Sequence, residues 1–114
     1  MGVSLYYTAR RSVPLTDGEL AAVGRVVDTF NANAPFSEEE VLYLYDGLES
    51  GTVLDGSTKL PAEEERVVPS LVHWLAGVTA LRRAVPDADW AFTLDDYEIE
   101  WDDRTGYDLP GLGD

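Results

Sequence analysis

The chain contains no cysteine, which excludes disulfide bridges, thiolate zinc sites and cysteine nucleophiles. The absence of cysteine fits a reducing compartment, and we expect a cytoplasmic protein. The N-terminal residues do not resemble a signal peptide, and no apolar stretch approaches the ~20 residues that a membrane-spanning helix needs. We therefore expect no membrane partner.

Basic residues are scarce, since eight Lys and Arg residues stand against 22 Asp and Glu residues, for a formal net charge of −14. Nucleic-acid binding depends on Lys and Arg displacing the cations condensed on phosphates, and it usually shows as a basic patch or stripe. The composition therefore argues against nucleic acid and favours a basic protein partner. The alternative is that the acidic residues only keep a small protein soluble.

Motifs for phosphate chemistry and catalysis are also missing. The sequence has no G-x-G-x-x-G run and no P-loop. His73 is the single histidine and could act as a general base or a metal ligand. Its neighbours on the predicted helix face are the small residues Gly77, Ala80 and Ala84, which favours a close helix or subunit contact. We expect neither a catalytic residue nor a cofactor; the alternative is a homodimer with a small-ligand pocket or a weak enzymatic role for His73.

Acidic residues are in excess near the C-terminus. Residues 86–114 contain ten acidic residues and a single arginine. Five aromatic residues are interleaved with them, namely Trp90, Phe92, Tyr97, Trp101 and Tyr107. Acidic and aromatic residues at strand spacing predict a folded, strongly negative surface rather than a disordered tail.

The first part of the chain predicts a strand and then a helix. Residues 3–10 alternate between apolar and polar positions, which is typical of a strand. Thr16 and Glu19 form a capping box, and an apolar stripe continues to Phe30. We therefore expect a helix that begins after Thr16.

The middle of the chain predicts two further strands. Residues 41–45 are rich in β-branched, leucine and tyrosine residues. Ser37 and Glu40 could instead cap a helix through the same residues. We favour the strand because the run ends so soon. Residues 52–60 predict a weaker strand, in which Gly56 marks a bulge.

The last part of the chain predicts a connector, a helix and a strand. Residues 61–66 form an acidic connector, and residues 70–85 carry an apolar stripe that indicates a second helix. The parity of the apolar residues then changes at Asp95 and Asp96. A two-residue turn there would pair Leu94 with Tyr97, but Asp-Asp is a poor tight turn, so we favour one long strand with a bulge.

The resulting order, β-α-β-β-α-β, predicts an α+β protein of the ferredoxin-like class. We expect a four-stranded antiparallel sheet with two helices on one face and an acidic C-terminal strand or extension. All 114 residues are expected to form a single domain, with residues 107–114 as an irregular tail. This scaffold supports many unrelated activities, so it does not identify a function.

The acidic segment is the main candidate for partner binding. Its carboxylates would imitate the charge of phosphates, as in an immunity protein or inhibitor that occupies the cationic cleft of a toxin or nuclease. The candidate carboxylates are Asp95, Asp96, Glu98, Glu100, Asp102 and Asp103. Tyr97 and Trp101 lie among them and are candidate anchors, because aromatic residues dominate interface energetics.

Three tyrosines form a second part of the predicted site. If Leu42 and Leu44 pack on the helices, then Tyr43 and Tyr45 face the opposite side of the sheet, and Tyr6 does so by the same alternation. Tyrosine is enriched at protein–protein interfaces. We expect these rings either to contact a partner or to cover the sheet backbone.

The aspartates also raise the alternative of a cation site. Asp95, Asp96, Asp102 and Asp103 are hard oxygen ligands that would suit calcium or magnesium. Their spacing does not match an EF-hand loop, and adjacent aspartates at turns usually bind local backbone groups. We therefore expect no metal.

Overall fold

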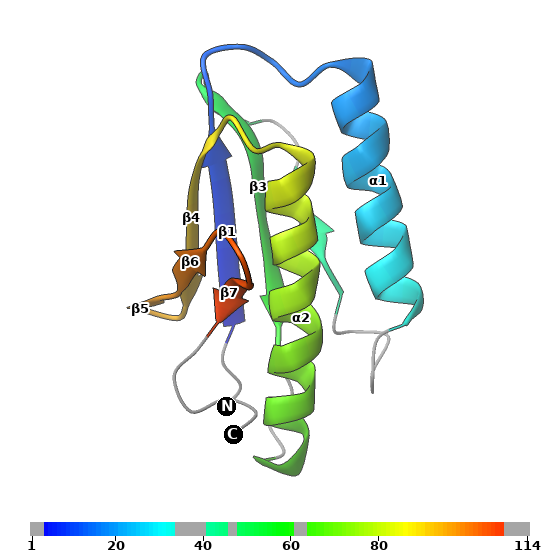
Figure 1. Ribbon diagram of the computed structural model, residues 1–114, viewed down its shortest axis with the longest axis vertical. Helices are drawn as coiled ribbons and strands as arrows, with labels where there is room; N and C mark the ends of the chain where they lie inside the picture. Colours follow the sequence, from blue (N-terminus) through cyan, green and yellow to red (C-terminus); the bar gives the residue numbers. More distant parts are fainter. Residues whose placement is uncertain (1–3, 34–40, 46–47, 61–63, 109–114) are drawn as a thin grey trace.

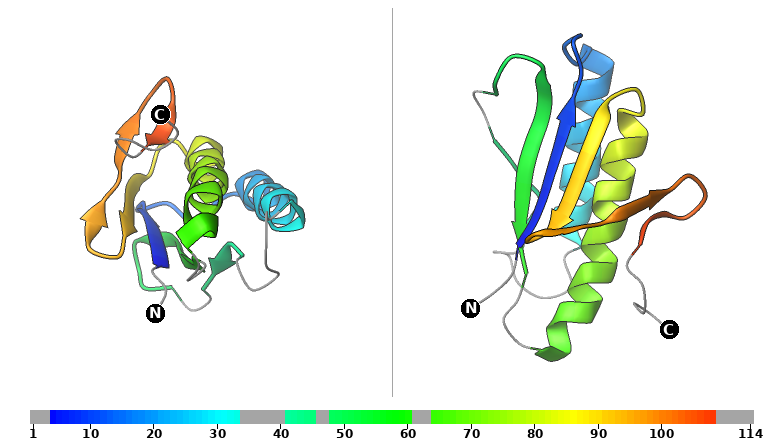
Figure 2. Two further views of the ribbon diagram at one scale, coloured as in Figure 1. Left: turned by 90° about the horizontal axis from the view of Figure 1, so that it is seen from below. Right: turned by 90° about the vertical axis from the view of Figure 1, so that its left-hand side faces the viewer.

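The computed structural model describes residues 4–33, 41–45, 48–60 and 64–108. Two helices, α1 (Asp17–Ala32) and α2 (Glu64–Ala84), lie on one face of an antiparallel sheet (Figures 1 and 2). The sheet has the order β2-β3-β1-β4-β5. Its strands are β1 (Ser4–Arg10), β2 (Tyr43–Leu44), β3 (Thr52–Lys59), β4 (Asp89–Leu94) and β5 (Tyr97–Glu98). The α+β class and the two helices are confirmed, but the sheet has five strands where four were predicted.

The core lies between this sheet and the two helices. Leu5 and Tyr7 of β1 are fully buried, as is Phe92 of β4, and all three point toward the helices. Trp74 of α2 is also fully buried and is the largest side chain in this layer. The period-two pattern of β1 therefore describes its burial correctly, from Ser4 onward; residue 3 lies outside the described residues.

The edge strand β2 is shorter than predicted, since only Tyr43 and Leu44 have strand geometry. The Tyr45 N–H continues the pairing by donating to the Asp55 carbonyl oxygen at 2.8 Å. Ser37 and Glu40, the residues of the alternative helix cap, lie outside the described residues.

The predicted bulge at Gly56 is wrong. The register of β1 against β3 shifts between Ala9 and Arg10 instead, away from Gly56. A side chain at Gly56 would meet the Tyr43 carbonyl oxygen and the Tyr7 ring. Gly56 is therefore a point of close approach between strands, which is the other common use of glycine inside a sheet.

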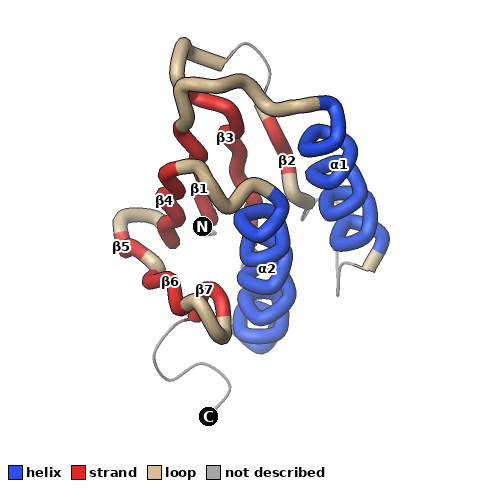
Figure 3. Tube along the Cα trace, turned by 45° about the horizontal axis from the view of Figure 1, so that its top comes forward, coloured by secondary structure: helices blue, strands red, loops and turns tan. Residues whose placement is uncertain are grey.

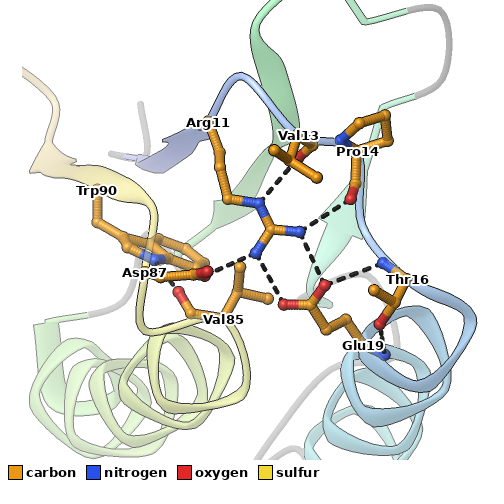
Figure 4. A network of polar contacts seen from close by, with 8 residues as sticks. All are labelled: Arg11, Val13, Pro14, Thr16, Glu19, Val85, Asp87 and Trp90. Atoms are coloured by element: carbon orange, nitrogen blue, oxygen red, sulfur yellow. Dashed lines mark hydrogen bonds and ion pairs between the residues drawn. The ribbon is translucent and has the colours of Figure 1, made fainter.

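Helix α1 begins with the predicted capping box, in which Thr16 and Glu19 bond reciprocally. Arg11 extends this cap into a network that joins three segments (Figure 4). Its guanidinium binds both carboxylate oxygens of Glu19 at 2.7 and 2.8 Å, and it contacts Asp87, after α2, at 2.6 Å. It also donates to the carbonyl oxygens of Val13 and Pro14. The start of α1 is thereby tied to the connection that follows α2.

The Arg11 network predicts a pH-dependent contribution to stability. Hydrogen bonds from Arg11 hold the pKa of Glu19 at about 2, below its ordinary 4.5. A lowered pKa stabilises the fold above the ordinary pKa, and the effect is lost as pH falls toward the folded-state value. We therefore expect Glu19→Gln to lower the melting temperature at pH 7, with the difference from the wild type shrinking between pH 4.5 and 2.

Thermal denaturation followed by circular dichroism across this pH range would measure the effect of Glu19→Gln. Glu49→Gln is the matched control, because Glu49 is exposed and lies outside the network. A difference between Glu19→Gln and wild type that stays constant down to pH 2 would contradict the assignment.

Helix α2 starts earlier than predicted, at Glu64 rather than near Ser70. Residues 64–66 of the predicted acidic connector are therefore helical, whereas residues 61–63 lie outside the described residues. The helix continues through Pro69, although proline lacks the N–H for an intrahelical bond. Val67 packs against the core in this added segment, and such tertiary contacts override the local preference of proline.

A tight hairpin replaces the favoured single strand in the acidic segment. Leu94 of β4 pairs with Tyr97 of β5, so the two-residue turn at Asp95 and Asp96 is the correct alternative. Asp95 adopts a φ of 49°, which aspartate tolerates better than most residues. Its carboxylate accepts a bond from the Ser4 N–H at 3.1 Å, and its own N–H donates to the Ser4 carbonyl oxygen. These bonds stabilise a turn that the sequence alone disfavours.

The described residues end in a second hairpin, where an irregular tail was predicted from residue 107 onward. Strand β6 (Glu100–Asp102) pairs with β7 (Gly106–Asp108), so Tyr107 is in a strand and Trp101 pairs with it. The hairpin follows the edge strand β5 and brings β7 beside α2 (Figure 3). The prediction of an irregular tail is wrong for this part, and residues 109–114 lie outside the described residues.

Candidate functional site

Three exposed tyrosines gather on the sheet face opposite the helices. Tyr6, Tyr43 and Tyr45 have 47%, 60% and 40% of their surface exposed. The strand register places Ser57 of β3 between Tyr6 of β1 and Tyr43 of β2. The Tyr45 hydroxyl lies 2.6 Å from the Ser57 hydroxyl, and the Tyr43 and Tyr45 ring centres are 5.6 Å apart. We call the surface of these four residues the tyrosine face.

A buried tyrosine on the helix side of the sheet fixes the strand that carries two of these rings. The Tyr7 hydroxyl donates to the Ser57 carbonyl oxygen at 2.9 Å and accepts from the Tyr43 N–H at 3.2 Å. The missing side chain of Gly56 leaves room for the Tyr7 ring beside β2. Burial raises the pKa of Tyr7 to about 12, so the hydroxyl keeps its proton at neutral pH. The Tyr7 hydroxyl therefore fixes the backbone of Tyr43 from the helix side of the sheet.

One carboxylate of the acidic segment shares a row with the tyrosine face. Glu98 of β5 pairs with Thr93 of β4, which in turn pairs with Tyr6. Residues directly opposite each other point to the same face of a sheet, and neighbouring strands are about 4.8 Å apart. Glu98 therefore lies roughly 10 Å from Tyr6, on the same face. Asp55 of β3 also faces this side, where it accepts a hydrogen bond from the Thr8 hydroxyl at 3.0 Å.

Charges of both signs border the tyrosine face. The carboxylates of Glu98 and Asp55 flank the rings, and Asp89 stands at the start of β4. The cations Arg10 and Lys59 are exposed at the ends of their strands. The face therefore offers aromatic rings from β1 to the edge strand β2, with the Asp55 carboxylate on β3 between them and the Glu98 carboxylate on β5 at the opposite edge.

The remaining acidic residues of the segment lie elsewhere. Asp102 accepts bonds from the N–H groups of Arg104 and Thr105 at 2.7 and 3.2 Å, so it closes the turn between β6 and β7. Asp103 accepts from the indole N–H of Trp101 at 2.7 Å. These two carboxylates stabilise the hairpin, which is the usual use of aspartate at a turn. Glu100 is exposed on β6 of the same hairpin.

Trp101 is an internal anchor of this hairpin. The Arg82 guanidinium lies 4.2 Å from the centre of the Trp101 ring, a cation–π arrangement. Trp101 also packs edge-on against Tyr107 at 5.0 Å, and the Tyr107 hydroxyl accepts a bond from Arg82. Burial raises the pKa of Tyr107. The structure therefore uses Trp101 to hold the hairpin on α2.

Tyr97 and Asp96 lie at the edge of the sheet, away from the tyrosine face. Tyr97 pairs with Leu94, which pairs with the buried Leu5, so Tyr97 points to the helix side. It is nevertheless 54% exposed, because β5 is the outermost strand. Asp96 is exposed in the adjacent turn. The predicted site is therefore split between the tyrosine face, this turn and the β6–β7 hairpin.

His73 lies between the two helices. Its Nε2 atom is 2.8 Å from the Phe30 carbonyl oxygen, which can only accept, so Nε2 carries the proton and donates. The imidazole also packs on the rings of Phe30 and Trp74, at 5.2 and 4.5 Å between centres. Phe30 also lies against Gly77. This arrangement connects α1 to α2 and leaves Nε2 engaged in a structural bond.

The described part of the chain holds no group of three or more His, Cys, Asp or Glu side chains placed to bind a metal ion. Among the described residues, Asp95 and Asp102 are each bonded to backbone N–H groups in separate turns. Neither of the helices in these residues is long and apolar enough to cross a membrane.

Sequence reasoning missed Asp55, Ser57 and the supporting role of Tyr7. A signal for the first two is present, because Asp55 and Ser57 alternate with Leu54 and Gly56 along β3. The role of the Tyr7 hydroxyl has no such signal, since it depends on which strand lies beside Gly56. No protein-family model matches the chain, and no curated protein or solved structure matches it significantly.

Proposed function

We propose that this protein is a non-catalytic binding module that docks a basic protein partner on its tyrosine face. The observation that carries the proposal is the cluster of Tyr6, Tyr43 and Tyr45 around Ser57, in the same cross-strand row as Glu98. Both helices cover one face of the sheet (Figure 2), and the strand register together with the exposure of the rings places these tyrosines on the other face.

The chemistry of the tyrosine face suits an arginine or lysine side chain. A cation over an aromatic ring is attracted by the ring quadrupole, typically by about 0.5–1 kcal/mol at an exposed site. Asp55 would pair with such a cation, and Glu98, two strands away from Tyr6, would pair with a second cation of the partner. Tyrosine also brings a large apolar area at low cost in side-chain entropy, and it is enriched among interface hot spots.

The other acidic residues contribute at longer range. Asp96, Glu100 and Asp103 are exposed around the sheet edge and the β6–β7 hairpin, and the whole chain carries −14. A field of this sign attracts a basic partner and accelerates its encounter with the protein. An immunity protein or inhibitor that blocks the cationic cleft of a toxin or nuclease is the class that fits this combination.

The strand order supports a ferredoxin-like scaffold for this module. In the order β2-β3-β1-β4, β3 lies between β1 and β2, the two strands that α1 connects. This is the split βαβ arrangement. Strands β5, β6 and β7 would then be a C-terminal extension of that scaffold. The cysteine-free sequence supports a cytoplasmic location for the module.

The test is partner capture from lysate of the source organism, followed by binding kinetics with the partner that is identified. We expect Tyr43→Ala to weaken binding by roughly 30-fold, the effect of removing an interface hot spot. Tyr97→Ala is the matched control, because Tyr97 is equally exposed but points to the other side of the sheet. We expect it to leave the affinity unchanged.

Salt provides a second measurement on the same complex. The association rate should fall by about tenfold or more between low and high salt, because steering by exposed charges is screened. Equal losses for Tyr43→Ala and Tyr97→Ala would remove the tyrosine face from the interface. A mass in light scattering of twice the 12.5 kDa of one chain, lost in Tyr43→Ala, would assign the face to a homodimer instead.

A further inference from the structure

A long apolar groove runs along the outer side of the helix layer, on the opposite side of the molecule from the tyrosine face. Its volume is about 880 Å³. Helix α2 forms the floor through Val72, Ala76 and Ala80, which recur at every fourth position. Helix α1 forms one wall, and Tyr107 of the β6–β7 hairpin belongs to the other. The hairpin and α1 lie on different sides of α2 (Figure 2, left). Val72 is 51% exposed, so the apolar surface is open to solvent.

The described residues that line this groove include two charged side chains, and both are arginines. Phe30 of α1 lies against Gly77 of α2, and the two helices run in opposite directions (Figure 1). Arg25 precedes Phe30 by five residues and Arg83 follows Gly77 by six, so the two arginines lie at the same end of the groove. This end therefore places two arginine side chains beside an apolar channel, and Arg83 also donates to the Arg104 carbonyl oxygen.

We propose that this groove binds an amphipathic α-helix of a partner protein, with acidic residues beside one end of its apolar stripe. The floor from Val72 to Ala84 is about 18 Å long, the rise of three helical turns. Small floor residues allow another helix to approach closely, and a groove that is open on top suits a helix, which buries only one face. The acidic residues of that helix would lie against Arg25 and Arg83.

This second surface does not depend on the tyrosine face. A protein with both would join a basic partner on its sheet to an acidic helix on its helix layer. A second copy of this chain is the alternative occupant, and the test below distinguishes it from an acidic helix of a partner.

The test uses a synthetic helical peptide of about 16 residues, which spans the groove with one turn to spare. The peptide carries leucines at i, i+3, i+4 and i+7 and glutamates beside one end of that stripe; a second peptide has lysine in place of each glutamate. Amide chemical shifts would locate the bound peptide, and fluorescence anisotropy would give the affinity. We expect shifts at Val72, Ala76 and Ala80, and binding of the lysine peptide at least tenfold weaker.

Variants of exposed residues separate groove binding from general charge effects. Arg25→Glu should weaken binding of the acidic peptide by roughly tenfold, because it reverses one of the two groove cations. Ala76→Glu should do the same by placing a carboxylate on the floor. Arg10→Glu changes the net charge equally but lies on the sheet side, so it should have little effect.

Three outcomes would overturn the groove proposal. The acidic peptide could fail to bind saturably at millimolar concentration. Arg25→Glu and Arg10→Glu could weaken binding equally, which would make the attraction non-specific. Sedimentation could show a dimer that Ala76→Glu dissociates, which would assign the groove to a second copy of the chain.

Discussion

Replacing Gly56 by alanine should lower the free energy of unfolding by about 3 kcal/mol, the upper end of the usual cost of overpacking. The added methyl group would meet the Tyr43 carbonyl oxygen on one side and the Tyr7 ring on the other. The first contact is with backbone, so relief requires the edge strand β2 to move. Movement of β2 would also break the hydrogen bond from the Tyr43 N–H to the Tyr7 hydroxyl.

The consequence of Gly56→Ala for function follows from the same contacts. Strand β2 carries Tyr43 and leads directly to Tyr45, so its displacement would disperse the tyrosine face. We therefore expect the variant to lose partner binding even at temperatures at which it remains folded. Tyr97→Ala, which leaves β2 untouched, should retain binding.

Urea denaturation of wild type and Gly56→Ala would measure the change in stability. Gly24→Ala is the control, because a side chain at Gly24 meets nothing within 4 Å. Since Gly24 lies inside α1, alanine there should stabilise the protein by about 0.5–1 kcal/mol. A Gly56→Ala protein as stable as wild type would show that β2 is not confined by this contact.

Gly106→Ala should destabilise the protein by about 2–3 kcal/mol, through backbone strain and a collision acting together. Gly106 has a φ of 88°, in the left-handed region that favours glycine. A side chain added at this position would meet the Thr79 side chain, which is buried on α2. The Thr79 hydroxyl donates to the Leu75 carbonyl oxygen and accepts from the Tyr107 N–H, so it has no freedom to rotate away.

Gly51→Ala separates the two contributions in Gly106→Ala. Gly51 has nearly the same φ, 87°, but a side chain there meets nothing within 4 Å. Its replacement should therefore show the strain alone, about 1 kcal/mol. Both variants would be compared by urea denaturation.

Tryptophan fluorescence would report whether the hairpin has left α2 in Gly106→Ala. Trp101 should lose its contact with Arg82 in that variant and become more exposed. Equal destabilisation by Gly51→Ala and Gly106→Ala would mean that the hairpin moves to accommodate the added methyl group with no further loss of stability.

The local patterns of the sequence predicted those parts of the structure that depend on neighbouring residues. The alternation of β1 and of residues 41–45 placed Tyr6, Tyr43 and Tyr45 on one face, because successive side chains of a strand point to opposite sides. The capping box correctly predicted the start of α1, because Thr16 and Glu19 bond to each other within a single helical turn.

The acidic segment shows where local patterns were insufficient. The alternation of its apolar residues is compatible with a hairpin or with one bulged strand, and Asp-Asp by itself is a weak turn signal. The hairpin forms because Asp95 also bonds to Ser4, which is 91 residues away in the chain. The predicted cluster of carboxylates was divided for a similar reason, because Trp101 and Tyr107 pack on Arg82 of α2 and draw Asp102 and Asp103 away from the sheet.

The α+β class, the two helices, the exposed faces and the strongly negative charge could all be predicted from the sequence. Each of these follows from composition or from periodicity within one element. The packing of separate elements brings Tyr7 beside Gly56, joins Glu19 to Asp87 through Arg11, and places Arg25 and Arg83 along one groove. These contacts join residues distant in the sequence, and a periodic pattern states which way a side chain points but not what it meets there.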